Sequence, residues 1–294
     1  MPKIIVTAVL LIIANACFAQ KDTIRKWLDA QLNFTNKKNG IYPAIIFKQE
    51  NHWQLSADYP AGTTAVAMSF KDPDLTIRDG HYIRYYPALQ KAEEGNFINN
   101  LQEGVWQSWY PNGNRKDSDT FKNNITTGTW VMRYFNGNPE VIISFKEDSS
   151  SIRESSWFRE DGTKSSKEKY VLGKLVNLEC FDGKGVYVGA TCSVLKPPVF
   201  IHPFFTAEEY IVDQLHRNKN KNIRNEGEAE VSFTIIKTGK IEKLEITNSP
   251  DTALSNNIIK IMAAMPAWSP AILHNRVVDF PMQLVIPFYR GKGD

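Results

Sequence analysis

Glycine and aromatic residues recur every 24 positions through the middle of the chain. Four columns share this spacing: Gly80, Gly104 and Gly128; Tyr82, Trp106 and Trp130; Tyr86, Tyr110 and Tyr134; and Phe97, Phe121 and Phe145. A fixed period is the mark of a repeat array, and a 24-residue unit suits one β-hairpin rather than a pair of helices. The pattern therefore predicts an antiparallel array of hairpins over residues 76–195, with less regular units at its ends that fit capping.

Turn residues stand at fixed places within each unit. Asn112-Gly113 and Asn136-Gly137 are typical of hairpin turns, because Asn and Gly both tolerate positive φ. Asn123-Asn124 would lead the chain into the next unit. A single hairpin is marginal in water, so the stability of such an array comes from contacts between neighbouring units.

The region before the array, residues 20–75, has a weaker pattern. Apolar residues spaced by three and four between residues 21 and 35 predict a short helix. An irregular β-region follows from Ile41 to Phe70. Its Tyr59-Pro60-Ala61-Gly62 resembles Tyr110-Pro111-Asn112-Gly113, which indicates a degenerate repeat.

Residues 196–294 have the pattern of a separate domain, which begins after the linker Lys196-Pro197-Pro198. A capping box at Thr206–Glu209 predicts a helix to about Arg217. Apolar and polar residues then alternate over 228–235, and a turn at Thr238-Gly239 leads into a second strand.

The last third of this domain predicts a helix and a strand. Ser249 and Pro250 are read as the N-cap and first residue of the helix, which Pro266 stops. The final strand places its even-numbered residues from Val278 to Phe288 on an apolar face. The sequence thus predicts a mostly β repeat array followed by a small α+β domain, with two helices on a three-stranded antiparallel sheet.

The first 19 residues read as a signal peptide. Lys3 supplies a positive charge, Ile4–Ile13 an apolar core, and Ala19 a small residue before the cleavage point. The apolar run is shorter than the about 20 residues of a spanning helix. An exported, periplasmic protein is expected, and the alternatives are an uncleaved inner-membrane anchor and a lipoprotein modified at Cys17.

Two cysteines, Cys180 and Cys192, remain after the signal. Oxidising compartments favour disulfides, and the turn signal at Asp182–Gly185 would bring the two sulfurs together. The sequence favours a bridge, with two isolated buried thiols as the alternative.

Composition and charge narrow the classes of function. The net charge of +3 becomes +2 without Lys3, and the signs are interspersed, which gives no nucleic-acid or membrane footprint. No nucleotide-binding or nucleophile motif occurs, and the five histidines lack metal-ligand spacing. We therefore expect no enzyme activity, cofactor or metal. Trp106, Trp109 and Trp130 fit a packed aromatic ladder better than a sugar-binding platform.

The array resembles MORN-type repeats, in particular those of exported bacterial proteins. The resemblance rests on the G-x-W-x-x-x-Y-x-N-G units and F-x-N-N links and covers about 110 residues. It implies a long antiparallel hairpin sheet that mediates contacts and carries no active site.

The last domain is similar to the TonB C-terminal domain over roughly residues 196–290. The motif residues are Pro266, Trp268, Pro270 and Phe288, together with the hairpin that contains Gly239. The resemblance implies a periplasmic domain that engages outer-membrane transporters by strand pairing. Full energy transducers carry a spanning helix and a Pro-rich spacer, whereas a hairpin array occupies the place of the spacer here.

The final strand supplies the candidate binding surface. Pro281 and Pro287 are both odd-numbered, so both missing N–H donors lie on one side of the strand, and proline favours edge strands. Gln283 and Val285 would offer their amides and carbonyls to a partner along this edge. The alternative is that the edge is only blunted and the partner binds elsewhere.

These observations predict an envelope protein–protein interaction module linked to TonB-dependent transmembrane transport. Its partner would be an outer-membrane transporter or another envelope protein, and the chain could also form a homo-oligomer. One alternative is an anchored energy transducer. The other is an exported carbohydrate-binding or hydrolytic protein that uses the aromatic array.

Overall fold

The computed structural model describes residues 23–145, 152–217 and 223–289. The signal-peptide and lipoprotein predictions, residues 1–19 and Cys17, therefore lie outside the described residues. The chain divides into two compact units, Met1–Gly137 and Asn138–Asp294. The boundary expected at 195/196 falls inside the second unit.

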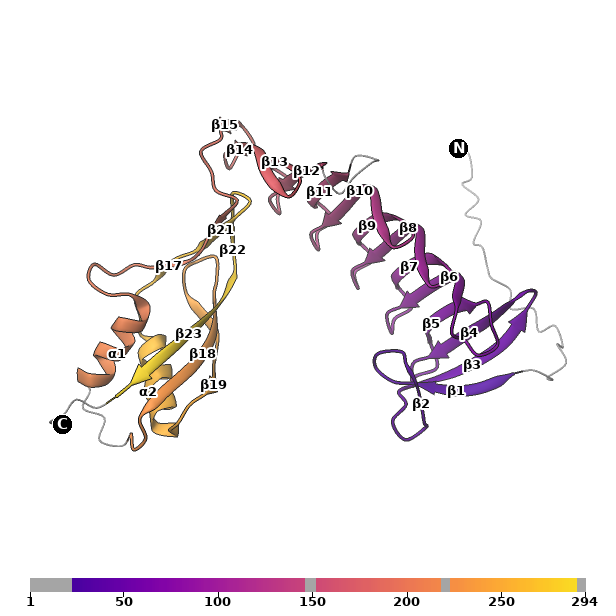
Figure 1. Cartoon of the computed structure of the whole chain (residues 1–294), viewed down its shortest axis with the longest axis horizontal. Helices are drawn as coiled ribbons and strands as arrows, with labels where there is room; N and C mark the ends of the chain where they lie inside the picture. Colours follow the sequence, from indigo (N-terminus) through magenta and orange to yellow (C-terminus); the bar gives the residue numbers. More distant parts are fainter. Residues whose placement is uncertain (1–22, 146–151, 218–222, 290–294) are drawn as a thin grey trace, which may run out of the picture. The chain divides into compact units, whose positions relative to one another are not determined.

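The first unit is an antiparallel sheet (Figure 1). Its strands are β1 (Ile24–Leu28), β2 (Phe34–Thr35), β3 (Tyr42–Gln49), β4 (His52–Asp58), β5 (Thr64–Phe70), β6 (Arg78–Tyr85), β7 (Lys91–Ile98), β8 (Leu101–Trp109), β9 (Arg115–Lys122) and β10 (Ile125–Arg133). From β3 to β10 each strand pairs with the next along the chain. A chain of hairpins is the architecture that the 24-residue period predicts.

The helix expected between residues 21 and 35 is wrong. Residues Ile24–Leu28 form β1, which pairs with β3 from Ile24↔Ile46 to Leu28↔Tyr42. Apolar spacing over so short a segment does not decide between helix and strand. The edge of β3 supplies backbone partners along the whole segment, and burial of Leu28, 1% exposed, fixes its end.

Two kinds of turn alternate along the sheet. Asn99-Asn100 and Asn123-Asn124 both adopt positive φ, between 49° and 67°, as two-residue turns require. At the other end of the hairpins a single residue does so, with φ of 84° at Gly113 and 64° at the equivalent Leu89. The hairpin turn expected at Asn112-Gly113 is present, and it is closed by a hydrogen bond from the Tyr110 amide to the Asn114 carbonyl.

The tyrosine column links successive units through hydroxyl groups. Tyr59, Tyr86 and Tyr110 donate hydrogen bonds to the backbone carbonyls of Tyr85, Trp109 and Arg133, at 2.8, 2.9 and 2.6 Å. Tyr59 also begins a turn with the same backbone bonds as Tyr110. The segment around Tyr59 thus repeats the geometry of the array.

The second unit contains more strands of the hairpin type and then both helices of the described residues. Its elements are β11 (Pro139–Phe145), β12 (Ile152–Phe158), β13 (Lys164–Val171), β14 (Lys174–Phe181), β15 (Tyr187–Gly189), β16 (Leu195–Lys196), β17 (Val199–Phe200), α1 (Ala207–Arg217), β18 (Gly227–Ile235), β19 (Ile241–Asn248), α2 (Thr252–Ala263), β20 (Trp268–Ser269), β21 (Ala271–Leu273), β22 (Arg276–Val278) and β23 (Phe280–Phe288). Strands β11–β15 pair in sequence order, and β19-β18-β23 form a three-stranded antiparallel sheet. The chain is therefore mostly β with two described helices, as its pattern predicts.

Local capping explains where the two helices begin. At α1 the Thr206 hydroxyl accepts from the Glu209 amide, and the Glu209 carboxylate accepts from the Thr206 amide, which confirms the capping box. The N-cap expected at Ser249 is wrong. Asp251 caps α2 instead, accepting from the amides of Ala253 and Leu254. A carboxylate is at least as good a cap as a hydroxyl, and Pro250 precedes it.

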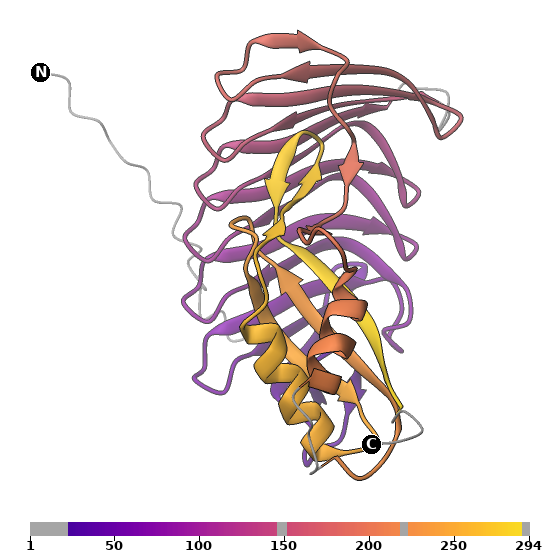
Figure 2. The ribbon, with the colours of Figure 1, turned by 90° about the vertical axis from the view of Figure 1, so that its left-hand side faces the viewer.

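Both helices pack on one face of the three-stranded sheet (Figure 2). The core consists of buried residues from α1, α2 and alternate positions of β18 and β23: Ile211, Leu215, Leu254, Ile258, Met262, Val231, Phe233, Leu284, Ile286 and Phe288. Within the described residues, neither helix is long and apolar enough to cross a membrane.

Candidate functional site

Strand β23 lies at one edge of the three-stranded sheet. It pairs with β18 along its full length, from Phe280↔Ile235 to Phe288↔Gly227. No other strand among the described residues pairs with its outer side. Leu284, Ile286 and Phe288 enter the core, as the even-numbered pattern predicts.

The two prolines of β23 define the direction of its amides. Pro281 lies opposite Thr234 and Pro287 opposite Glu228, both inside an unbroken ladder. Proline has no N–H, so it fits this ladder only where the amide would point away from β18. The odd-numbered amides of Gln283 and Val285 therefore face outward, and the Val285 side chain is 49% exposed.

The sheet face opposite the helices is polar beside this edge. Glu228 and Glu230 are exposed and lie opposite Pro287 and Val285. A depression of about 470 Å³ continues along this face and is lined by Ser232, Phe233, Thr234, Lys243, Pro281, Met282 and Gln283. Two exposed carboxylates of β18 thus lie on this face, one strand inward from the outer edge of β23.

Of the four residues on which the expected TonB resemblance rests, Trp268 and Phe288 are part of the hydrophobic core. Trp268 is 5% exposed and packs against Phe200 and Phe233, with ring centroids 5.4 and 5.8 Å apart. Its amide donates to the Gly239 carbonyl, and a Cβ on Gly239 would lie only 2.1 Å from the Trp268 oxygen. Pro266 is exposed, Pro270 is half-buried and Phe288 is buried.

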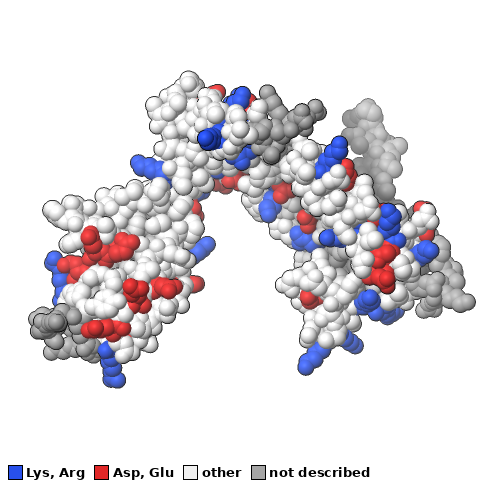
Figure 3. Space-filling view, viewed as in Figure 1, with Lys and Arg blue, Asp and Glu red and all other residues white. Residues whose placement is uncertain are grey.

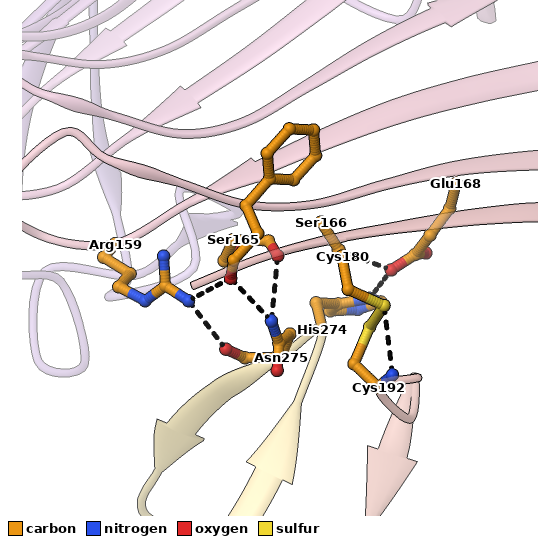
Figure 4. The surroundings of a disulfide bond; sticks show 9 residues. Arg159, Ser165, Ser166, Glu168, Cys180, Cys192, His274 and Asn275 are labelled. Carbon is orange, nitrogen blue, oxygen red and sulfur yellow. Dashed lines mark hydrogen bonds and ion pairs between the residues drawn. A yellow bond between two sulfur atoms is a disulfide. The ribbon is translucent and has the colours of Figure 1, made fainter. Parts of the chain in front are cut away.

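A disulfide joins β14 to the chain that leaves the hairpins (Figure 4). Cys180 is fully buried, and its Cα lies 5.9 Å from that of Cys192. This is the pairing that the sequence favours. The Cys192 amide also donates to the Cys180 sulfur.

The tip of the β21–β22 hairpin inserts beside this disulfide. His274 Nδ1 lies 2.6 Å from Glu168 Oε1, and its ring stacks on Trp157 with centroids 3.6 Å apart. Glu168 is 1% exposed and also accepts from Ser166 and Tyr170. Burial raises the pKa of Glu168, but these donors, led by His274, outweigh burial and lower the pKa below its ordinary value.

Two neighbouring residues of the same tip bind backbone carbonyls. Asn275 donates its side-chain amide to the carbonyls of Ser165 and Phe181. Arg276 reaches the Glu140 carboxylate and the Phe158 carbonyl, each at 3.2 Å. Three consecutive residues, His274–Arg276, thus fasten the hairpin to strands β11–β14. We refer to these contacts as the hairpin clasp.

Sequence reasoning missed the hairpin clasp entirely. The pattern Ala-Ile-Leu, then His274-Asn275, then Arg-Val-Val carries a signal for a two-residue turn between strands, and both turn residues adopt positive φ. Glu168, which contacts His274, lies 106 residues earlier in the chain. No local pattern reports such a contact.

The aromatic rings of the first unit are mostly packed against each other. Trp106 is 5% exposed, stacks on Tyr82 at 5.5 Å and meets Phe97 edge-on at 4.9 Å. Cavities of about 570 and 380 Å³ adjoin Trp106, Glu93 and Gln102. Trp109 and Trp130 are only half-buried. Trp106 thus belongs to a packed ladder, and its ring presents little surface to a sugar.

Comparison of the chain with models of protein families and with curated proteins gives no match. Within residues 23–145, 152–217 and 223–289, no group of three or more His, Cys, Asp or Glu side chains is placed to hold a metal ion.

Proposed function

We propose that this chain is a protein–protein interaction module of the bacterial cell envelope, without enzyme activity. In this proposal a MORN-like hairpin array carries a TonB C-terminal-like domain, which captures an extended segment of an outer-membrane transporter or another envelope protein. The observation that carries the proposal is the outer edge of β23, which has no strand neighbour among the described residues.

Main-chain pairing with an exposed edge needs no particular side chain, so it suits capture of an extended segment. Two prolines limit the edge to a short run of donors around Gln283 and Val285, which also protects it from unspecific pairing. We therefore expect binding that is weak and short.

Charge indicates which segments would bind best. Glu228 and Glu230 lie on β18, the strand next to β23, and Figure 3 shows acidic side chains gathered over the part of the second unit that bears the helices. Complementary potentials speed association and favour the correct partner. We therefore expect segments with a net positive charge to bind better than acidic ones.

The test is a cross-linked affinity purification from envelope fractions with two variants of one residue. Val285→Pro removes the outward amide, whereas Val285→Thr changes the side chain and keeps that amide. The proposal predicts that only Val285→Pro loses the envelope partner while both variants melt like wild type. Unchanged capture by Val285→Pro would place the partner elsewhere.

A further inference from the structure

The last long strand of the hairpin series, β14, extends well beyond its neighbour β15. The two strands pair only at Cys180↔Gly189 and Phe181↔Tyr187. The short strand β15 at the top of Figure 2 leaves the rest of β14 uncovered. Among the described residues no strand pairs with the outer side of the segment Lys174–Glu179. We call this segment the β14 edge.

This end of the sheet is apolar at its surface. Large hydrophobic side chains there are strongly exposed: Leu172 76%, Leu175 41%, Val176 56%, Val186 58%, Tyr187 59% and Val188 46%. Repeat arrays end in units with a polar outer face, because an open apolar end is poorly soluble. The less regular unit at this end, which the sequence suggested as a cap, exposes apolar side chains instead. An open edge is also a template for pairing.

The β14 edge is complementary to itself. It reads Lys-Leu-Val-Asn-Leu-Glu, so that reversal exchanges the two charges and the two leucines. A β-bulge between Leu175 and Asn177, opposite Lys169 and Tyr170, makes Val176 an extra residue. The registers therefore put Lys174 and Glu179 on one face of the sheet and Leu175 with Leu178 on the other.

We propose that the β14 edge binds the β14 edge of a second copy of this chain, antiparallel, across a two-fold axis. Lys174 of each copy then lies opposite Glu179 of the other, and Leu175 opposite Leu178. Directly opposed cross-strand pairs of these types are favourable, and a two-fold axis makes each pair twice. The hairpin sheets of two molecules become continuous through this contact. The contact is independent of the edge of β23.

Charge exchange tests this contact by analytical ultracentrifugation of the intact exported chain. Lys174→Glu and Glu179→Lys each replace two attractive pairs by two repulsive ones, and each should raise the dimer Kd about tenfold or more. The double variant Lys174→Glu/Glu179→Lys restores opposite charges and should bring the Kd back to within about threefold of wild type.

Lys122→Glu is the matched control. Lys122 is exposed and precedes the two-residue turn Asn123-Asn124, much as exposed Lys174 follows the two-residue turn Leu172-Gly173, but Lys122 lies on β9 between two paired strands. This control should leave the Kd unchanged. Thermal melting of each variant separates unfolding from dissociation. A wild type that stays monomeric up to about 100 μM overturns the proposal. The proposal is also overturned if either single charge reversal leaves the dimer Kd unchanged, or if the double variant has a Kd as high as that of the single variants.

Discussion

At the scale of the residue, Glu168 stands out in the second unit because it is a buried carboxylate that needs hydrogen-bond donors. Its carboxylate is almost without solvent contact, and its three donors come from His274, Ser166 and Tyr170. A buried charge is tolerated only with such partners. His274 is the one donor that belongs to the β21–β22 hairpin, so the charge of Glu168 depends on the hairpin clasp.

Replacing His274 by Ala should destabilise the second unit by about 3–5 kcal/mol, because it leaves a buried carboxylate short of a donor. Urea unfolding at pH 7 measures this change. The control is His81→Ala, which removes a more exposed His–Glu contact. His81 lies 3.1 Å from Glu94, and the two side chains are 51% and 28% exposed. This variant should cost no more than about 1 kcal/mol. Equal losses of unfolding free energy in the two variants would show that the buried His274–Glu168 contact stabilises the chain no more than an exposed one.

The dependence of stability on pH follows from the same carboxylate. Its pKa is lower in the folded chain than in the unfolded chain, so the unfolded state binds more protons in the acid range. The stabilisation is fully present above the ordinary Glu pKa of about 4.3 and is lost as pH falls through the lower folded value. Glu168→Gln should therefore show a flatter decline of unfolding free energy below about pH 5 than wild type. Parallel curves would contradict this assignment.

At the scale of the element, the aromatic columns share a period but not an environment. Trp106 is buried by Tyr82, Phe97 and Gly95, where an added Cβ would lie 2.2 Å from the Trp106 ring. Trp130, one unit later, is only half-buried. Equivalent positions in a repeat therefore differ in energy.

Trp106→Ala should destabilise the first unit by about 3–5 kcal/mol, since it opens a large cavity among packed rings. Trp130→Ala should cost clearly less, because its ring already contacts solvent. Denaturant unfolding of the two variants gives the comparison. Similar losses would mean that the period alone sets the stability of each unit.

Local patterns predicted the elements whose causes are local. The glycine and aromatic period, the capping box at Thr206 and the alternation in β18 and β23 each describe neighbours along the chain. The helix expected over 21–35 failed because pairing with β3 overrides the spacing of five residues. The fold of the candidate edge was readable because proline itself restricts pairing, whereas the hairpin clasp joins residues more than 100 positions apart.

At the scale of the whole chain, the second unit is fastened at two nearby places. The disulfide Cys180–Cys192 fixes the segment that leaves β14, and the hairpin clasp returns to the same strands. A bridge that closes so short a loop gains about 3 kcal/mol in the chain-entropy model. Together these contacts hold the helix-bearing part of the unit on its last hairpins.

Thiol labelling of the purified chain checks the disulfide. Denatured, unreduced chain that begins after the predicted signal peptide should show no reactive thiol, and reduction should reveal two. Two reactive thiols before reduction would contradict the bridge.

Amide hydrogen exchange on β23, with and without the partner proposed above, tests the central claim most directly. The amides of Gln283 and Val285 point outward and should exchange fast in the isolated chain, then slow at least about tenfold when a partner strand pairs with them. The even-numbered amides of Leu284 and Ile286, already bonded to β18, should change little. Protection that appears elsewhere, while Gln283 and Val285 keep exchanging at their free rate, would contradict capture at this edge.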